Sequence, residues 1–159
     1  WQGHKGTNKQ TNMSKFKFFL LIATTLILSI SISSCGTAGC TDAKAENYDS
    51  KAKKNCCCEY KGTVVFWYGK TTSQNLITYG STVLTYYVDG KIVGSGATNI
   101  YWTSSPSCGQ AASITVEKDL GDVTNKSFSY RIVDQDGDVI WDGYENWTAN
   151  TCLKDELTF

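Results

Sequence analysis

The chain has 159 residues, in which 15 lysine and arginine residues balance 15 aspartate and glutamate residues. The sequence contains no basic patch, so nothing in it indicates a nucleic-acid partner. The only histidine, His4, lies near the start, so Ser-His-Asp, Cys-His and histidine–zinc sites are excluded from the rest of the chain. A serine–lysine pair stays open, although no motif marks one. We therefore expect a chain that is not an enzyme and needs no cofactor.

Residues 13–35 have the pattern of an export signal. Lys15 and Lys17 give a short positive segment, and residues 18–32 follow as a mostly apolar run of about 15 residues. A membrane-spanning helix needs about 20 apolar residues, so a signal peptide over residues 13–34 is favoured over a lone membrane helix. Residues 1–12 are polar and lack a start methionine, and we interpret them as an extraneous or upstream segment.

The signal ends in Ile32, Ser33, Ser34 and Cys35, which resemble the bacterial lipobox of an aliphatic residue, two small residues and a cysteine. The resemblance implies that the Cys35 thiol carries a lipid and that cleavage makes Cys35 the first mature residue. Acyl chains would then hold the protein at a membrane. We expect a lipoprotein of the bacterial cell envelope, with the outer membrane favoured over the inner. An ordinary secretory signal is the alternative.

Seven cysteines occur in the chain. If Cys35 is lipidated, an even number remains, which favours disulfides in an exported protein. A metal site is the competing interpretation, but the cysteines lack Cys-x-x-Cys spacing and no histidine accompanies them. Cys56 and Cys57 are adjacent, and a bond between them would strain the geometry. We expect those two to reach other cysteines or to pair between chains.

Residues 35–60 form a polar segment with almost no aliphatic core, so burial alone cannot fold it. It resembles a cysteine-bounded repeat of surface and secreted proteins from Bacteroidetes-type bacteria. The matching positions are Gly39, Cys40, Thr41, Asp42, Ala45, Asn47, Tyr48, Asp49, Ala52, Cys58, Glu59 and Tyr60. The resemblance implies a Cys40–Cys58 bond, which is worth about 3 kcal/mol on the chain-entropy estimate. We interpret the segment as a spacer between membrane and domain.

Residues 61–159 contain short aromatic and β-branched runs that are typical of strands. We expect strands at 63–68, 82–88, 91–93, 99–103, 113–117, 127–133, 139–142 and 151–159, and a short strand or loop edge at 76–79. Asp89 and Gly90 predict a type I′ hairpin turn. No run beyond the signal shows helical periodicity. The pattern predicts one all-β domain, an immunoglobulin-like or transthyretin-like β-sandwich, preceded by the signal helix and a disulfide-bounded linker.

The same region resembles small lipoprotein domains of that bacterial group in several short motifs. These are Phe66-Trp67, the loop at 105–109, Trp141 with Gly143, and the strand that carries Cys152. The resemblance implies a β-sandwich and brings no activity with it. Cys108 and Cys152 are the two cysteines of this domain and therefore the first choice for a bond.

Two sets of side chains are candidate ligand sites. Asp134, Asp136 and Asp138 alternate between two predicted strands, and we interpret them as a hairpin turn, with a weak calcium loop as the alternative. Exposed aromatic side chains can form a binding platform. Our candidates for a platform are Tyr144 and Trp147, which lie in a turn-rich stretch, together with Trp102.

These features predict a membrane-anchored, non-enzymatic module for interaction or structure in the cell envelope. Its partners would be the membrane, through the lipid, and a glycan or an envelope protein. A glycan-binding surface module and a calcium-stabilised adhesion module are the alternatives.

Overall fold

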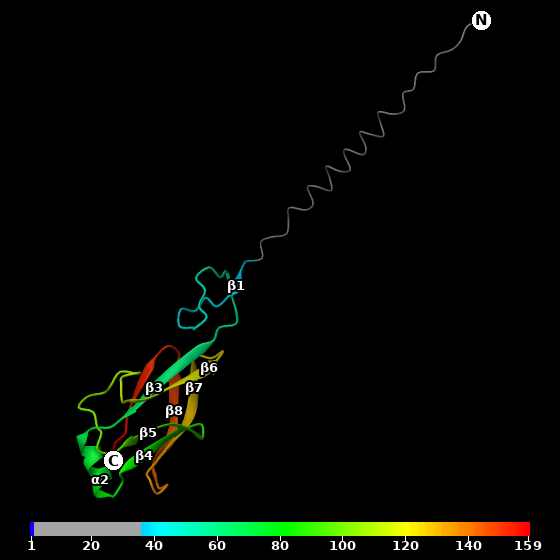
Figure 1. The fold of residues 1–159 in the computed structure, drawn as a ribbon. Helices are drawn as coiled ribbons and strands as arrows, with labels where there is room; N and C mark the ends of the chain where they lie inside the picture. Colours follow the sequence, from blue (N-terminus) through cyan, green and yellow to red (C-terminus); the bar gives the residue numbers. More distant parts are fainter. Residues whose placement is uncertain (2–35) are drawn as a thin grey trace. The chain divides into compact units, whose positions relative to one another are not determined.

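The computed structural model describes residue 1 and residues 36–159. The predicted signal peptide and the predicted lipid site at Cys35 lie outside the described residues. The elements are β1 (Ala38–Gly39), β2 (Lys54–Asn55), β3 (Tyr60–Trp67), α2 (Lys70–Thr78), β4 (Val83–Val88), β5 (Lys91–Ala97), β6 (Ile114–Gly121), β7 (Asn125–Val133), β8 (Val139–Thr148) and β9 (Cys152–Glu156). The described part is mostly β and contains one short helix, so the predicted β class is confirmed only in this coarser form (Figure 1).

Seven strands of residues 60–156 form two sheets (Figure 1). In the first sheet, β3 lies between β6, which is antiparallel to it, and β9, which is parallel to it. In the second sheet the order is β5-β4-β7-β8, and all neighbours are antiparallel. Strands β1 and β2 pair separately, in the spacer. The pairing of β3 with β9 joins the two ends of the domain.

Strand β3 lies at the centre of the core. Side chains alternate between the two faces of a strand, so Val64 and Phe66 share one face while Val65 lies on the other, and all three are buried. The Phe66 ring lies 6.0 Å from the ring of Tyr86 on β4 and 5.5 Å from the ring of Tyr130 on β7, measured between centroids. The two sheets therefore pack against each other through Phe66, and burial on both faces explains the unbroken apolar run.

The β4–β5 hairpin turns where the sequence predicted. Asp89 and Gly90 have φ angles of 49° and 70°. Both central residues of a type I′ turn need a positive φ, which Asp and Gly tolerate best. The predicted turn is confirmed.

The helix α2 was not predicted, and the expectation of a strand or loop edge at 76–79 is wrong. Two turns of helix are too short for a 3.6-residue period to appear in the sequence. The helix is held by tertiary contacts: Leu76 is fully buried, and the Ser73 hydroxyl donates to the carbonyl of Thr98 at 2.6 Å. Gly80, with a φ of 90°, follows its end.

Residues 99–103 form a loop, so the predicted strand there is also wrong. The Trp102 N–H donates to the carbonyl of Tyr68 at 3.0 Å, just beyond the end of β3, and extends no ladder. Further along the same loop, Pro106 is fully buried. A bond from Cys108 to Cys152 ties this loop to β9.

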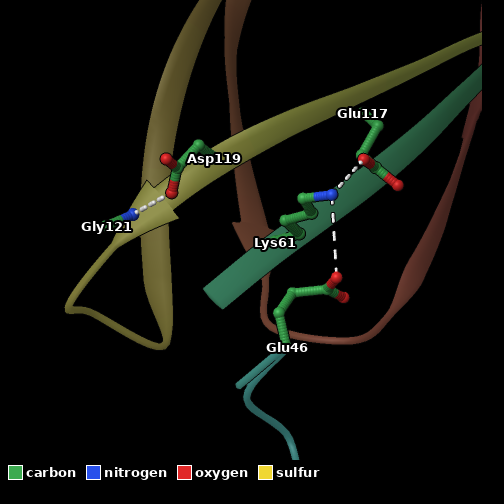
Figure 2. Close-up of polar contacts among 5 residues, drawn as sticks. All are labelled: Glu46, Lys61, Glu117, Asp119 and Gly121. Carbon is green, nitrogen blue, oxygen red and sulfur yellow. Dashed lines mark hydrogen bonds and ion pairs between the residues drawn. The ribbon is translucent and has the colours of Figure 1, made fainter. Parts of the chain in front are cut away.

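The spacer is joined to β3 by side-chain contacts. The Tyr60 hydroxyl donates to Asp42 Oδ2 at 2.9 Å. Lys61 Nζ lies 3.6 Å from Glu46 Oε2 in the spacer and 3.0 Å from Glu117 Oε1 on β6, as Figure 2 shows. One cation thus bridges carboxylates from two parts of the chain, and these carboxylates raise the pKa of Lys61, Glu117 contributing most.

Candidate functional site

The outer face of the four-stranded sheet carries an open hollow of about 270 Å³. Its lining residues, which define the sheet-face hollow, are Tyr87, Gly90, Ser129, Tyr130, Arg131, Asp142, Gly143 and Tyr144. They come from β4, β7, β8 and the hairpin turn. Gly143 has no side chain, and a Cβ there would meet the Tyr130 ring at 3.1 Å, so a larger residue at this position would crowd the sheet.

Strand register explains why these residues gather. Tyr87 pairs with Arg131, which pairs with Asp142, so one row crosses three strands. In a neighbouring row Ser129 pairs with Tyr144. Directly paired residues project from the same face of a sheet, with their Cβ atoms about 5 Å apart. The hollow is therefore a property of the sheet rather than of a loop.

Arg131 is held in place by an aromatic ring. Its guanidinium carbon lies 5.2 Å from the centroid of Tyr87. A cation–π contact at an exposed site contributes about 0.5–1 kcal/mol, and the flat guanidinium keeps its N–H donors available at its edge. Tyr144, by contrast, is 78% exposed. The hollow thus combines an open phenol ring, a positioned cation, a carboxylate and a hydroxyl.

The sequence placed Trp147 beside Tyr144 as an exposed aromatic, and this prediction is wrong. Trp147 is only 1% exposed, and its ring lies 4.9 Å from the Phe128 ring in the core. The stretch interpreted as rich in turns is the second half of β8. Residues three apart on a strand point to opposite faces, so an outward Tyr144 requires an inward Trp147.

Trp102 is partly buried and lines a different cavity, at the edge between β5 and β6. The three predicted aromatic residues are therefore not on one surface. Of the three predicted aromatic residues, only Tyr144 lines the sheet-face hollow. Its partners Tyr87 and Arg131 were missed because they lie in other strands, and only the pairing register brings them together.

The aspartates at 134–138 form a turn. Asp134 Oδ1 accepts the N–H groups of Asp136 and Asp138, each at 3.0 Å. Gly137 has a φ of 89°. Among residue 1 and residues 36–159, no group of three or more histidine, cysteine, aspartate or glutamate side chains is placed to hold a metal ion. The predicted turn is present, whereas calcium binding by Asp134, Asp136 and Asp138 stays a prediction.

The described cysteines form three disulfides. Cys40 is bonded to Cys58, the pairing that the repeat implied, and Cys108 is bonded to Cys152, the pair of the β domain. The third bond joins Cys56 to Cys57, contrary to the expectation that adjacent cysteines would find other partners. The other four described cysteines are paired with one another, and pairing of Cys56 or Cys57 between chains stays a prediction. Cys57 takes a positive φ of 56°.

The sequence prediction did not include the partly buried carboxyl group of Asp155. Asp155 pairs with Phe66 across β9 and β3, so it lies on the inner face. Its Oδ2 is buried without a hydrogen-bond partner among the described residues. Burial and then the nearby Glu145 raise the pKa of Asp155 to about 6. The alternation of Leu153, Asp155 and Leu157 was the signal, because it puts one carboxyl in an apolar row.

Comparison with known proteins adds no family to this description. No protein-family model, curated protein or solved structure matches the chain. In the part of the chain that the structure describes, no helix has the length and apolar character needed to cross a membrane.

Proposed function

We propose that this chain is a non-enzymatic binding module, held at the bacterial cell envelope by a lipid on Cys35, and that it binds its partner through the sheet-face hollow. The observation that carries the proposal is the 78% exposure of Tyr144 beside Arg131 and Asp142. An aromatic ring left open to water on a sheet face is a favourable contact surface. The lipobox pattern and the disulfides support an extracytoplasmic location.

The chemistry of the hollow fits a carbohydrate. The apolar face of a sugar ring can lie on a tyrosine ring, while its hydroxyls both donate and accept hydrogen bonds. Arg131 supplies donors, Asp142 supplies acceptors, and Ser129 supplies either. Groups of this kind fix orientation in sites that are otherwise lined by flat apolar surface. A glycan is therefore the partner class that we propose.

For the fold, we propose an immunoglobulin-like or transthyretin-like β-sandwich. The contact of Phe66 with Tyr86 and Tyr130 across the two sheets supports this. Residues 35–60 would act as the tether. A purely structural role in the envelope is the second candidate, and it is favoured by the compact disulfide-bonded spacer.

The test is a glycan array with the full chain, followed by titration of the polysaccharides that bind. Tyr144→Ala should weaken binding at least tenfold, because the stacking ring is lost. Tyr79→Ala is the matched control, since Tyr79 is 77% exposed but lies outside the hollow. An array with no binding, or equal losses in the two variants, would overturn the glycan proposal. Loss of membrane association in Cys35→Ser tests the lipid separately.

A further inference from the structure

The disulfide between Cys56 and Cys57 has no evident structural purpose. It lies on the short stretch that leads from β2 to β3. The other two described disulfides join residues that are distant in the sequence, one within the spacer and one between a loop and β9. A bond between neighbouring residues closes no loop of chain, so it lacks the entropic gain that makes other disulfides stabilising. Stabilisation of the fold therefore does not explain this pair.

The pair is the most accessible of the described disulfides. Cys57 is the only exposed cysteine among the described residues, and Cys56 is partly buried. Cys40, in contrast, is only 1% exposed. A disulfide is opened by attack of a thiolate on one of its sulfurs, so access to the sulfur controls the rate. Cys57 therefore offers an incoming thiol the best access.

The backbone at Cys57 favours an open bond. Its φ of 56° lies in the left-handed region, which residues other than glycine rarely adopt. The small covalent ring that two bonded neighbours form leaves this backbone little freedom to move. The carbonyl of Cys57 accepts a hydrogen bond from Nδ2 of Asn47 at 2.6 Å, and Oδ1 of Asn47 accepts the N–H of Glu59 at 3.0 Å. Once reduced, Cys57 can leave the left-handed region, so this conformation makes reduction more favourable.

Positive charge surrounds the pair in the sequence. Lys53 and Lys54, both exposed, precede Cys56 directly before Asn55, and Glu59 is the acidic residue on the same stretch. Nearby cations favour the thiolate form of a cysteine. Exchange is faster when the sulfur that leaves is a more stable thiolate. The two lysines therefore assist the departure of Cys56 when the neighbouring sulfur is attacked.

We propose that the Cys56–Cys57 bond is a thiol–disulfide exchange site, which a dithiol reductant opens before the other two described disulfides. One thiolate of the reductant attacks Sγ of Cys57, forms a mixed disulfide with it and expels Cys56 as a thiolate. The second thiol of the reductant then attacks its own sulfur in the mixed disulfide and releases Cys57. The reductant is oxidised to a disulfide, and its two electrons and two protons pass to the cysteines, which become thiols. This site is separate from the sheet-face hollow.

The test is stepwise reduction of the full chain carrying Cys35→Ser, which removes the one cysteine outside the described residues. Dithiothreitol is the probe, N-ethylmaleimide traps each released thiol, and tandem mass spectrometry assigns it. We expect Cys56 and Cys57 to be trapped roughly tenfold faster than the cysteines of the other two bonds, and only after dithiothreitol is added. Equal rates, or trapping of the pair without dithiothreitol, would overturn the proposal. A bond from either residue to another cysteine or to a second chain would also overturn it.

Two variants locate the fast reaction. Cys56→Ser combined with Cys57→Ser should abolish it and leave the reduction of the other two bonds unchanged. Lys53→Gln combined with Lys54→Gln keeps the pair and should slow its reduction about threefold at low salt but not at 1 M salt, where exposed charges are screened. Lys91→Gln, at an exposed position on β5, is the matched control and should have no effect.

The lysine variant decides the matter if the serine variant fails to fold. A fast reaction that survives in the folded serine variant would refute the exchange site. Reduction of the lysine variant at the wild-type rate in low salt would refute it as well.

Discussion

The spacer and the β domain are held together by different forces. In the spacer, Cys40 and Ala45 supply the buried apolar side chains, and the segment depends on the Cys40–Cys58 bond and on hydrogen bonds made by Asn47. In the domain, two sheets bury an apolar core around β3, and Cys40 and Ala45 of the spacer join the same cluster. A segment of about 25 residues cannot bury enough surface to fold by itself. The short repeat therefore depends on covalent closure, whereas in the domain the Cys108–Cys152 bond reinforces a packed core.

The contribution of the apolar core around β3 to the stability of the domain is tested most strongly by Phe66→Ala. Phe66 contacts rings in both neighbouring strands of the facing sheet, so its loss leaves a cavity in the interior. We expect the free energy of unfolding to fall by about 3–5 kcal/mol. Denaturant unfolding followed by tryptophan fluorescence measures this. Phe159→Ala is the control, since Phe159 is 62% exposed, and an equal loss in both variants would contradict the central role of β3.

The role of the Cys40–Cys58 bond in the spacer is tested by a double variant that carries Cys40→Ser and Cys58→Ser. The bond closes a loop with a sequence separation of 18, worth about 3 kcal/mol on the chain-entropy estimate. We expect amide hydrogen exchange in residues 40–58 to lose its protection, while the melting temperature of the β domain changes little. If the domain melts together with the spacer, the two parts are one cooperative unit and the comparison fails.

Much of the fold was predictable because local patterns decide it. The alternation in β7 and the Asp89-Gly90 turn are signals within a few residues, and tertiary context did not override them. The helix α2 was missed because its two turns are stabilised by burial of Leu76 and by the Ser73 bond to a distant carbonyl. Neither contact can be predicted from the neighbouring residues in the sequence, because both depend on distant parts of the chain.

The candidate site was less predictable than the fold. Tyr144 could be named as an exposed aromatic, but which of Tyr144 and Trp147 points outward depends on whether β8 continues through both. Arg131 and Tyr87 join the hollow only through the register of three strands. When the sequence does not fix which residues of a strand face outward, a residue predicted to bind a ligand can lie in the core instead.

Asp155 places a partly buried carboxyl group on the inner face of the three-stranded sheet, and its titration affects the stability of the fold. Its pKa in the fold, about 6, lies above the ordinary value of 3.8, and the groups that act on it or respond to it are Glu145 on β8 and Tyr130 on β7. The protonated form is therefore favoured by folding. Its contribution to stability is fully present below pH 3.8 and is lost as the pH rises from about 4 to about 6.

Asp155→Asn should remove this pH dependence. At pH 7 we expect the variant to be more stable by about 1 kcal/mol, which is less than the pKa difference alone implies, because water screens a half-exposed carboxyl group. Thermal melts between pH 4 and pH 7 measure the effect. Asp122→Asn, at an exposed position, is the control. A variant whose stability still falls over this range would show that another group titrates.

The smallest expected effect concerns the polar link between the two parts. Lys61 pairs with Glu46 in the spacer and Glu117 on β6, and all three side chains are substantially exposed (Figure 2). Exposed ion pairs contribute little and are screened by salt. Glu46→Gln should therefore increase exchange in the spacer slightly at low salt, and the difference should vanish at 1 M salt. Glu117→Gln is the matched variant on the domain side, and it should leave the spacer closer to wild type. A large effect that persists in high salt would mean that the spacer is docked on the domain by packing around Lys61, and the two parts would then share one mode of stabilisation.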